Sequence, residues 1–369
     1  MTTAVQKAPR ITLHDAELLA ADLYGLDVSA APLPSERDQN FALRNASGEQ
    51  FVLKIANAEE SLEFLDLQNQ LIQFLAARDT NLEFPRIVRT KAGETIATIK
   101  GEAGRQYFVR LLTWIDGVCF AKVERHDRKL LSSLGRALAQ MNAGLAQFSH
   151  DAAHRSFYWD LRNAGMAREL IGLLPESRRA MIERFFAEWE KIDWSSLRFS
   201  VIHNDANDYN ILVSQRPEPR VNAILDYGDV VHTATVCDLA IALAYVMLDK
   251  PDPIGAAAQV VAAYHETYPL DETEVEVLYT LAATRLCCSA AAHDAPGCNA
   301  EPRRYIAFPI FHAGFMLVCI AGGMAEWLKA HAWKACIRET VSWVRIPLPP
   351  PGPDFSEPSR TSANTEIQH

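Results

Sequence analysis

Two short polar segments on either side of an apolar stretch constrain this chain more than any other feature. The first segment, residues 203–210, fits the spacing His-x-Asp-x-x-x-x-Asn with His203, Asp205 and Asn210. The second follows an apolar run and reads Asp-Tyr-Gly-Asp over residues 226–229. Either pattern alone recurs by chance. Together, in this order, they are typical of a phosphoryl-transfer site of the protein-kinase type.

The stretch between the two segments predicts a β-hairpin. Residues 211–213 and 221–225 are apolar and rich in β-branched side chains, and a polar, proline-bearing connection separates them. Pairing of these strands brings their outer ends together. We therefore expect Asn210 and Asp226 to be neighbours in space.

This arrangement supplies the groups that phosphoryl transfer needs. One carboxylate accepts the proton of the attacking hydroxyl, while an amide and a second carboxylate hold magnesium against the phosphates. We assign Asp205 as the catalytic base and Asn210 and Asp226 as ligands of Mg²⁺, which prefers oxygen ligands and few protein carboxylates. The alternative is that Asp205 and Asp208 only cap turns, as aspartates often do.

Composition narrows the class of protein. The 369 residues are 49% apolar, which is enough for one large or two ordinary domains. A net charge of −10 argues against a nucleic-acid partner and suits a cationic small-molecule substrate. The seven cysteines are scattered without a paired zinc pattern, and the N-terminus has no apolar signal core. These features predict a cytoplasmic protein.

Residues 1–114 predict a nucleotide-binding lobe of strands and two helices. A capping box at Thr12 begins the first helix, and the second spans residues 59–77. Lys54 lies within an apolar strand, where it is either solvent-exposed or a phosphate contact. A kinase needs an acid on the second helix to hold such a lysine, and Glu63 or Asp66 can serve.

Residues 115–305 predict a catalytic and acceptor-binding lobe. The break at 115–117 resembles a hinge whose backbone meets a purine, and we place Leu112, just before it, in the nucleotide site. Amphipathic helices are expected over residues 125–141 and 162–189, and further helical segments over residues 236–248, 254–267 and 272–292. The predicted fold class is α+β, with a small antiparallel-sheet lobe and a large, mostly helical lobe.

Residues 306–369 form an atypical tail. Residues 306–324 carry no Lys, Arg, Asp or Glu and are long enough to span a membrane, but prolines and glycines interrupt them, so we expect no span. Residues 324–350 resemble a reading frame that runs through a transfer-RNA gene, and the proline-rich end predicts disorder. The alternative is an amphipathic appendage that docks a partner.

Several segments resemble a known family. The strand at 52–55 and the segments 203–210 and 226–229 are similar to the aminoglycoside phosphotransferase family of small-molecule kinases. Segments 32–41, 67–69 and 109–113 are most similar to the hydroxylysine kinases within it. The resemblance covers residues 10–305 and implies a protein-kinase-like fold, Mg²⁺, ATP or GTP as donor and a hydroxylated amine as acceptor. In bacteria, similar domains also occur fused to an aminotransferase.

The resemblance implies roles for named residues and also shows departures. Lys54 corresponds to the phosphate contact, and Asp66 falls where the hydroxylysine kinases have their helix acid. Asn204 stands where the family usually has glycine. The expected nucleotide loop, residues 35–40, contains no glycine, so the side chains of Ser35, Gln39 and Asn40 or backbone N–H groups have to contact the donor instead.

Three functions remain open from the sequence. The first is a kinase that phosphorylates an amino alcohol or a hydroxylated amino acid such as hydroxylysine, or an acceptor of the choline, homoserine or aminoglycoside type. In it Asp229 and Asp238 bind the substrate ammonium, unless both only cap helices. The second is a truncated, non-catalytic remnant that binds nucleotide. The third is a membrane-anchored kinase fragment that uses residues 306–324.

Overall fold

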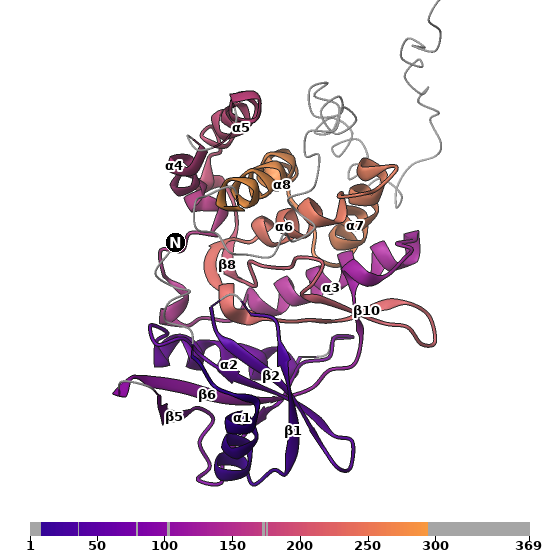
Figure 1. The fold of residues 1–369 in the computed structure, drawn as a ribbon. Coiled ribbons are helices and arrows are strands. Elements are labelled where there is room, and N and C mark those ends of the chain that lie inside the picture. The colour runs from indigo at the N-terminus through magenta and orange to yellow at the C-terminus, as the bar shows by residue number, and fades with distance from the viewer. Residues whose placement is uncertain are drawn as a thin grey trace, which may run out of the picture.

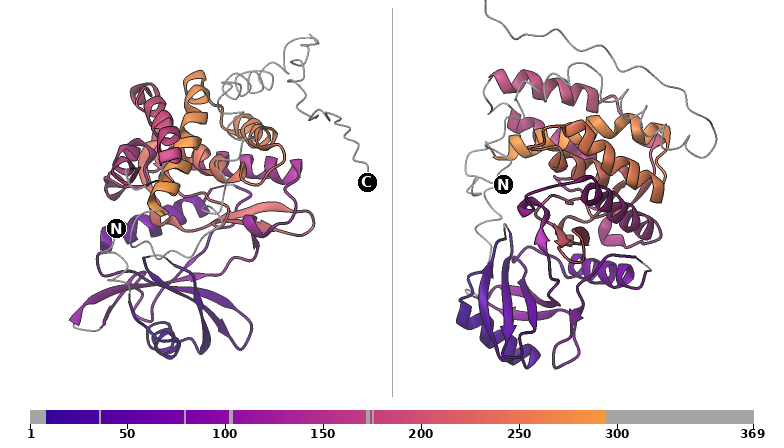
Figure 2. Two further views of the ribbon diagram at one scale, coloured as in Figure 1. Left: turned by 45° about the horizontal axis from the view of Figure 1, so that its top comes forward. Right: turned by 90° about the vertical axis from the view of Figure 1, so that its right-hand side faces the viewer.

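The computed structural model describes residues 9–35, 37–78, 80–101, 104–171, 174 and 176–293. Figures 1 and 2 show a lobe built on a β-sheet below a larger lobe built mostly of helices. This confirms the predicted α+β fold with two lobes. The expected tail, residues 306–369, with its membrane-span candidate and disordered end, lies outside the described residues.

The small lobe is one antiparallel sheet with three helical elements. The sheet runs in the order β1-β2-β3-β6-β4, and β5 also pairs with β6. Its elements are α1 (Leu13–Leu19), η2 (Ala20–Tyr24), β1 (Val28–Leu33), β2 (Gln39–Asn45), β3 (Gln50–Ile55), α2 (Leu62–Ala76), β4 (Ile87–Val88), β5 (Ala97–Lys100) and β6 (Gln106–Thr113).

Local sequence explains how this lobe begins. Thr12 and Asp15 form the predicted reciprocal capping box, and Gly25 ends the helical segment with a φ of 70°. Leu53 and Ile55 of β3 are buried against α1 and η2, so Lys54 points to the opposite face of the sheet. That opposite face is the one that α2 and the large lobe approach.

The large lobe surrounds a helical core. Its elements are β7 (Val118–Cys119), η4 (Phe120–Lys122), α3 (Arg128–Leu145), η5 (Asp151–Ala153), η6 (Leu161–Ala167), α4 (Arg168–Ile171), α5 (Glu176–Trp189), η7 (Trp194–Ser196), β8 (Phe199–Ile202), β9 (Ile211–Ser214), β10 (Arg220–Ile224), η8 (Tyr227–Asp229), β11 (Val231–Ala234), α6 (Val236–Val246), α7 (Pro253–Thr267) and α8 (Glu272–His293). Every residue of α6 is buried, which places it at the centre of this core.

One expected helix is wrong in its extent. The sequence predicts a helix over residues 162–189, but the structure has η6, α4 and α5 there. Pro175 lies between α4 and α5, and a proline removes a backbone donor and disfavours helical geometry in the residue before it. The amphipathic pattern is therefore divided among shorter elements.

Two features bring the site together. The predicted hairpin is present as β9 and β10, with Ile211 opposite Ile224, and β7 extends it to a three-stranded sheet. Helix α2 lies between β3 and β4 in the chain, yet Phe64, Leu67 and Leu71 pack in the core of the large lobe. Helix α2 therefore connects both lobes.

No helix among the described residues is long and apolar enough to cross a membrane.

Candidate active site

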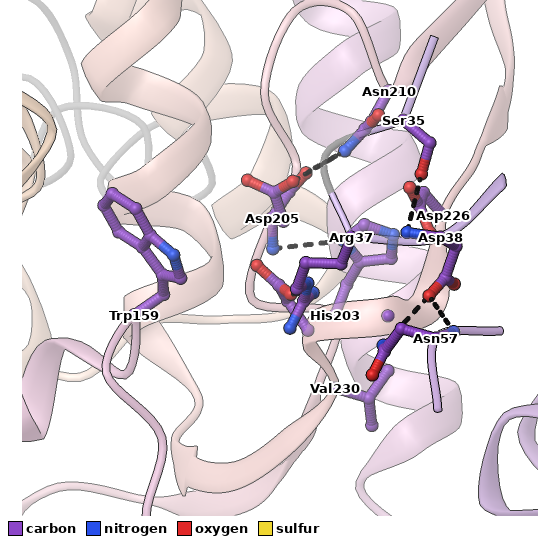
Figure 3. A network of polar contacts seen from close by, with 12 residues as sticks. Ser35, Arg37, Asp38, Asn57, Trp159, His203, Asp205, Asn210, Asp226 and Val230 are labelled. Atoms are coloured by element: carbon purple, nitrogen blue, oxygen red, sulfur yellow. Dashed lines mark hydrogen bonds and ion pairs between the residues drawn. The ribbon is translucent and has the colours of Figure 1, made fainter. Parts of the chain in front are cut away.

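The loop between β8 and β9 holds Asp205 from several sides. Asn210 donates through Nδ2 to Oδ2 of Asp205 at 2.8 Å and to its backbone oxygen at 2.9 Å. Asn207 donates to the same Oδ2 at 3.0 Å. Figure 3 shows the side chain of Asp205 facing Asn210 across this loop. The spacing His-x-Asp-x-x-x-x-Asn thus folds into a loop whose amides fix one carboxylate.

His203 ties this loop to the second segment. Its ring is fully buried, Nδ1 accepts from the backbone N–H of Asp205 at 3.2 Å, and Nε2 lies 2.9 Å from the backbone oxygen of Leu225. These partners fit a neutral imidazole that donates through Nε2. The histidine therefore sets the distance between the two segments and does not face a substrate.

Asp238 of α6 stabilises the loop between β8 and β9 by accepting a hydrogen bond from its backbone. Its Oδ1 accepts from the backbone N–H of Asn204 at 2.8 Å, and its Oδ2 accepts from Asn142 at 2.7 Å. The expected role of Asp238 in binding substrate is wrong, because its side chain is completely buried and both oxygens are engaged. Asn204 itself has a φ of 65°, which explains why asparagine can replace the usual glycine: it tolerates left-handed geometry better than most residues.

Asn210 and Asp226 are brought together as predicted. The backbone N–H of Leu225 donates to the backbone oxygen of Asn210 at 2.7 Å, so Asp226 is the next residue beyond the paired strand ends. Asp226 has a φ of 65° and a half-exposed side chain. Lys54 lies 3.1 Å from its Oδ1 and, as the main cause, lowers the pKa of Asp226 to about 2. The carboxylate therefore stays charged.

Asn210 and Asp226 fit a magnesium site in which the substrate phosphates supply further ligands. Both hydrogen bonds from the Asn210 side chain use Nδ2, which leaves its amide oxygen for a cation. No group of three His, Cys, Asp or Glu residues in the described part of the chain can hold a metal by itself. Mg²⁺ commonly binds one or two protein groups and takes its other ligands from phosphates and water.

The expected pairing of Lys54 with an acid on α2 is wrong. Asp66 accepts from Gln70 at 2.6 Å and lies 3.8 Å from His150, while Glu63 is exposed at the start of the helix. Among the described residues, Lys54 pairs with Asp226. The reason is the rotation of α2, which turns Asp66 away from the sheet.

Buried polar residues join α2 to the sheet in place of that ion pair. Arg110 stands directly opposite Lys54 in the β3–β6 register and donates to Gln68 at 2.7 Å and to Asn69 at 3.0 Å. Burial lowers the pKa of Arg110 to about 10. The segments 67–69 and 109–113, which carried part of the family resemblance, therefore meet in space.

The nucleotide loop is arranged differently from a glycine-rich cover. Ser35 accepts from the backbone N–H of Asp38 at 3.3 Å, so its hydroxyl shapes the loop. Gln39 forms two hydrogen bonds with the backbone of Ile11 and is not available to a donor, contrary to expectation. Asn40 pairs with Lys54 across the β2–β3 register and has a buried Oδ1 without a partner among the described residues.

Leu112 and Asp229 border the same region. Leu112 is buried on the face of the sheet that carries Lys54, since it stands opposite Val52. Asp229 ends η8 and receives a hydrogen bond of 2.5 Å from Arg37 of the nucleotide loop. Asp229 is therefore paired with a cation of the nucleotide loop in this structure, and its expected role in binding the substrate ammonium stays a prediction.

Two residues at the site were missed by the sequence reasoning. Arg285 of α8 donates to Oδ1 of Asp205 at 2.8 Å, and its guanidinium lies over Trp159. Figure 3 places Asp205 between Trp159 on one side and Arg37 on the other. A signal for Arg285 was present, because it is a lone charge inside the apolar stretch 281–288, and a buried charge needs a partner. No comparable signal marks Trp159.

Burial and charge act in opposite directions on Asp205. Burial raises the pKa of its carboxyl, while the Arg285 guanidinium and the Asn207 amide oppose that rise. A carboxylate with these surroundings can accept a proton from a hydroxyl at the site, because its basicity is higher than that of an exposed aspartate.

Fold and site together define a phosphotransferase of the protein-kinase-like class. A family model described as the phosphotransferase enzyme family (APH) matches residues 29–275. Hydroxylysine kinase of Mus musculus is 33% identical over 306 residues, which cover 75% of this chain and 80% of the mouse protein. The chain belongs to the phosphotransferase enzyme family, and it acts on an alcohol group as acceptor.

Solved structures share this fold at low sequence identity. Amicoumacin kinase hAmiN has a TM-score of 0.60 at 15% identity, over 87% of this chain and 93% of that chain. A microcompartment-associated aminopropanol kinase has a TM-score of 0.59 at 16% identity, over 88% of this chain and 95% of that chain. These likenesses show that the chain shares the two-lobed fold of those structures.

Proposed function

We propose that this protein transfers the γ-phosphate of ATP or GTP to the hydroxyl of a hydroxylated amino acid of the hydroxylysine kind, or of a related amino alcohol. The observation that carries the proposal is the carboxylate of Asp205, held by Asn207, Asn210 and Arg285 beside the Lys54–Asp226 pair. The identity to hydroxylysine kinase over most of both chains supports this choice of acceptor.

Each residue has a proposed task. Asp205 orients the acceptor hydroxyl and accepts its proton. Asn210 and Asp226 hold Mg²⁺, which offsets the charge of the phosphates when bound. Lys54 then contacts the phosphates, since metal binding at Asp226 weakens its hold on the lysine. Phosphoryl transfer passes through a loose, anionic transition state, so positioning and charge neutralisation are the main contributions of the protein.

Other residues near the site have proposed binding roles. Ser35, Asn40 and Leu112 border the nucleotide, and Oδ2 of Asp229 attracts the ammonium of the acceptor while Oδ1 accepts from Arg37. We keep the division between residues 114 and 115, because β6 ends the small sheet at Thr113 and β7 pairs with the large-lobe hairpin. The expected end of the large lobe at residue 305 lies outside the described residues. Cytoplasmic location and a relation to an aminotransferase stay predictions.

A nucleoside-diphosphate release assay tests the function. The acceptors are 5-hydroxylysine, homoserine, choline, 1-amino-2-propanol and kanamycin, each with ATP and with GTP at fixed Mg²⁺. We expect the highest kcat/KM with a hydroxylated amino acid, and no turnover above background for Asp205→Asn. Nucleotide binding without turnover of any acceptor would instead support the non-catalytic remnant.

A further inference from the structure

Arg37 connects the nucleotide loop to the large lobe. It lies between β1 and β2, and its Nη2 is 2.5 Å from Oδ1 of Asp229, which is 192 residues away in the sequence. Asp229 is the last residue of the segment 226–229, which begins with Asp226. Arg37 therefore reaches from the loop expected over the donor phosphates to the loop expected to hold magnesium.

The position of Gly228 shows how near Arg37 comes to that metal ligand. A Cβ on Gly228 would lie 3.3 Å from Oδ1 of Asp226 and 3.6 Å from Nη2 of Arg37. The same Oδ1 of Asp226 is 3.1 Å from Nζ of Lys54. Lys54 of the sheet thus contacts Asp226, and the charge of Arg37 in the loop also helps to lower the pKa of Asp226.

The guanidinium of Arg37 retains free donors. Arginine has five N–H donors, and among the described residues the structure gives Arg37 one hydrogen bond, to Asp229. Its side chain is 42% exposed, so a ligand can reach part of it. A planar guanidinium matches phosphate oxygens in a two-point contact, which a lysine cannot reproduce.

The loop has few other groups for this task. It contains no glycine, Gln39 is hydrogen-bonded to Ile11, and Ser35, which accepts a hydrogen bond from Asp38, offers a single uncharged O–H donor. We infer that Arg37 binds the terminal phosphate of the nucleotide donor, with Asp229 holding the guanidinium in place. This inference rests on the proposed function, and it assigns to a side chain the contact that a glycine-rich loop makes through its backbone.

Nucleotides of different phosphate length test the inference by binding alone. Dissociation constants are measured with Mg²⁺ for AMP, ADP and a non-hydrolysable ATP analogue, for the wild type, Arg37→Met and Arg37→Lys. For Arg37→Met we expect at least a tenfold weaker affinity for the ATP analogue, a smaller loss for ADP and none for AMP. The affinity of Arg37→Lys for the ATP analogue should lie between those of the wild type and Arg37→Met, because lysine keeps the charge but cannot make the two-point contact.

A matched control is Arg168→Met, which removes an arginine from an ion pair with Glu190 at the surface of the large lobe. It should leave all three affinities unchanged. Equal losses for the three nucleotides in Arg37→Met, or no loss, would overturn the inference and leave Arg37 as a bridge between lobes. The comparison of Arg37→Lys with wild type decides the question if the methionine variant does not fold.

The binding series also separates this inference from the proposed function. Turnover of no acceptor, together with a selective loss of ATP-analogue affinity in Arg37→Met, would reject the kinase activity and keep the phosphate contact. Failure of the wild type to bind any of the three nucleotides would reject both.

Discussion

The guanidinium of Arg285 donates a hydrogen bond of 2.8 Å to Oδ1 of Asp205, across 80 residues of sequence. Arg285 also bonds the hydroxyl of Tyr245 and the backbone oxygen of Trp159, and its side chain is 4% exposed. Asp205 is therefore held at both oxygens, by α8 on one side and by the amide of Asn210 on the other. The orientation of the candidate base depends on two distant parts of the chain.

Replacement of Asp205 by Asn should abolish most turnover and leave nucleotide binding nearly intact. The amide keeps the size of the carboxylate but cannot accept the hydroxyl proton, and general base catalysis contributes roughly 10²–10⁴-fold. Steady-state kcat and the affinity for an ATP analogue check this. A kcat similar to that of wild type would move the base to another residue.

Replacement of Arg285 by Met should shift the acid limb of the kcat profile to higher pH. Burial already raises the pKa of Asp205 and Arg285 opposes it, so loss of the guanidinium raises that pKa further. A base acts only when deprotonated, and activity at low pH is therefore lost first. Arg285→Lys keeps a positive charge, so the acid limb of its kcat profile should shift less than that of Arg285→Met. An equal loss at every pH would mean that Arg285 only supports the fold.

Asp226→Asn should raise the Mg²⁺ concentration needed for nucleotide binding by at least tenfold. The neutral amide loses the charge that attracts the cation, and hydrogen bonds and contacts to charged groups contribute about 1.5–3 kcal/mol. The matched control is Asp66→Asn, because Asp66 contacts Gln70 and not Lys54. We expect no change for the control. If the magnesium titration shifts for Asp66→Asn instead, Asp66 would regain its expected role as the acid of α2 in the nucleotide site.

Asn204→Gly should be more stable than Asn204→Ala by about 1 kcal/mol, because only glycine takes a positive φ without steric cost. The φ of Asn204 is 65°, and both polar atoms of its buried side chain lack partners among the described residues. Both replacements remove those polar atoms, so the comparison isolates the backbone. Denaturant unfolding of the two variants measures the difference, and equal stabilities would contradict the argument.

Short-range sequence patterns predicted much of the site. The spacing of His203, Asp205 and Asn210 was readable because one loop brings all three together within eight residues of chain. The hairpin of β9 and β10 is also local, so the neighbouring positions of Asn210 and Asp226 followed from strand pairing alone. The capping box at Thr12 belongs to the same kind of prediction.

Tertiary structure decided which charges meet. The rotation of α2 turned Asp66 outward and brought Gln68 to Arg110, and the packing of α6 buried Asp238 beneath the catalytic loop. Sequence spacing does not contain these relations, because partners far apart in the chain are selected by how helices pack and by the cost of burying an unpaired charge. The sequence thus determined the class of chemistry through local spacing. The fold determined the ion pairs of Arg37 and Arg285, because each joins surfaces that only packing brings into contact.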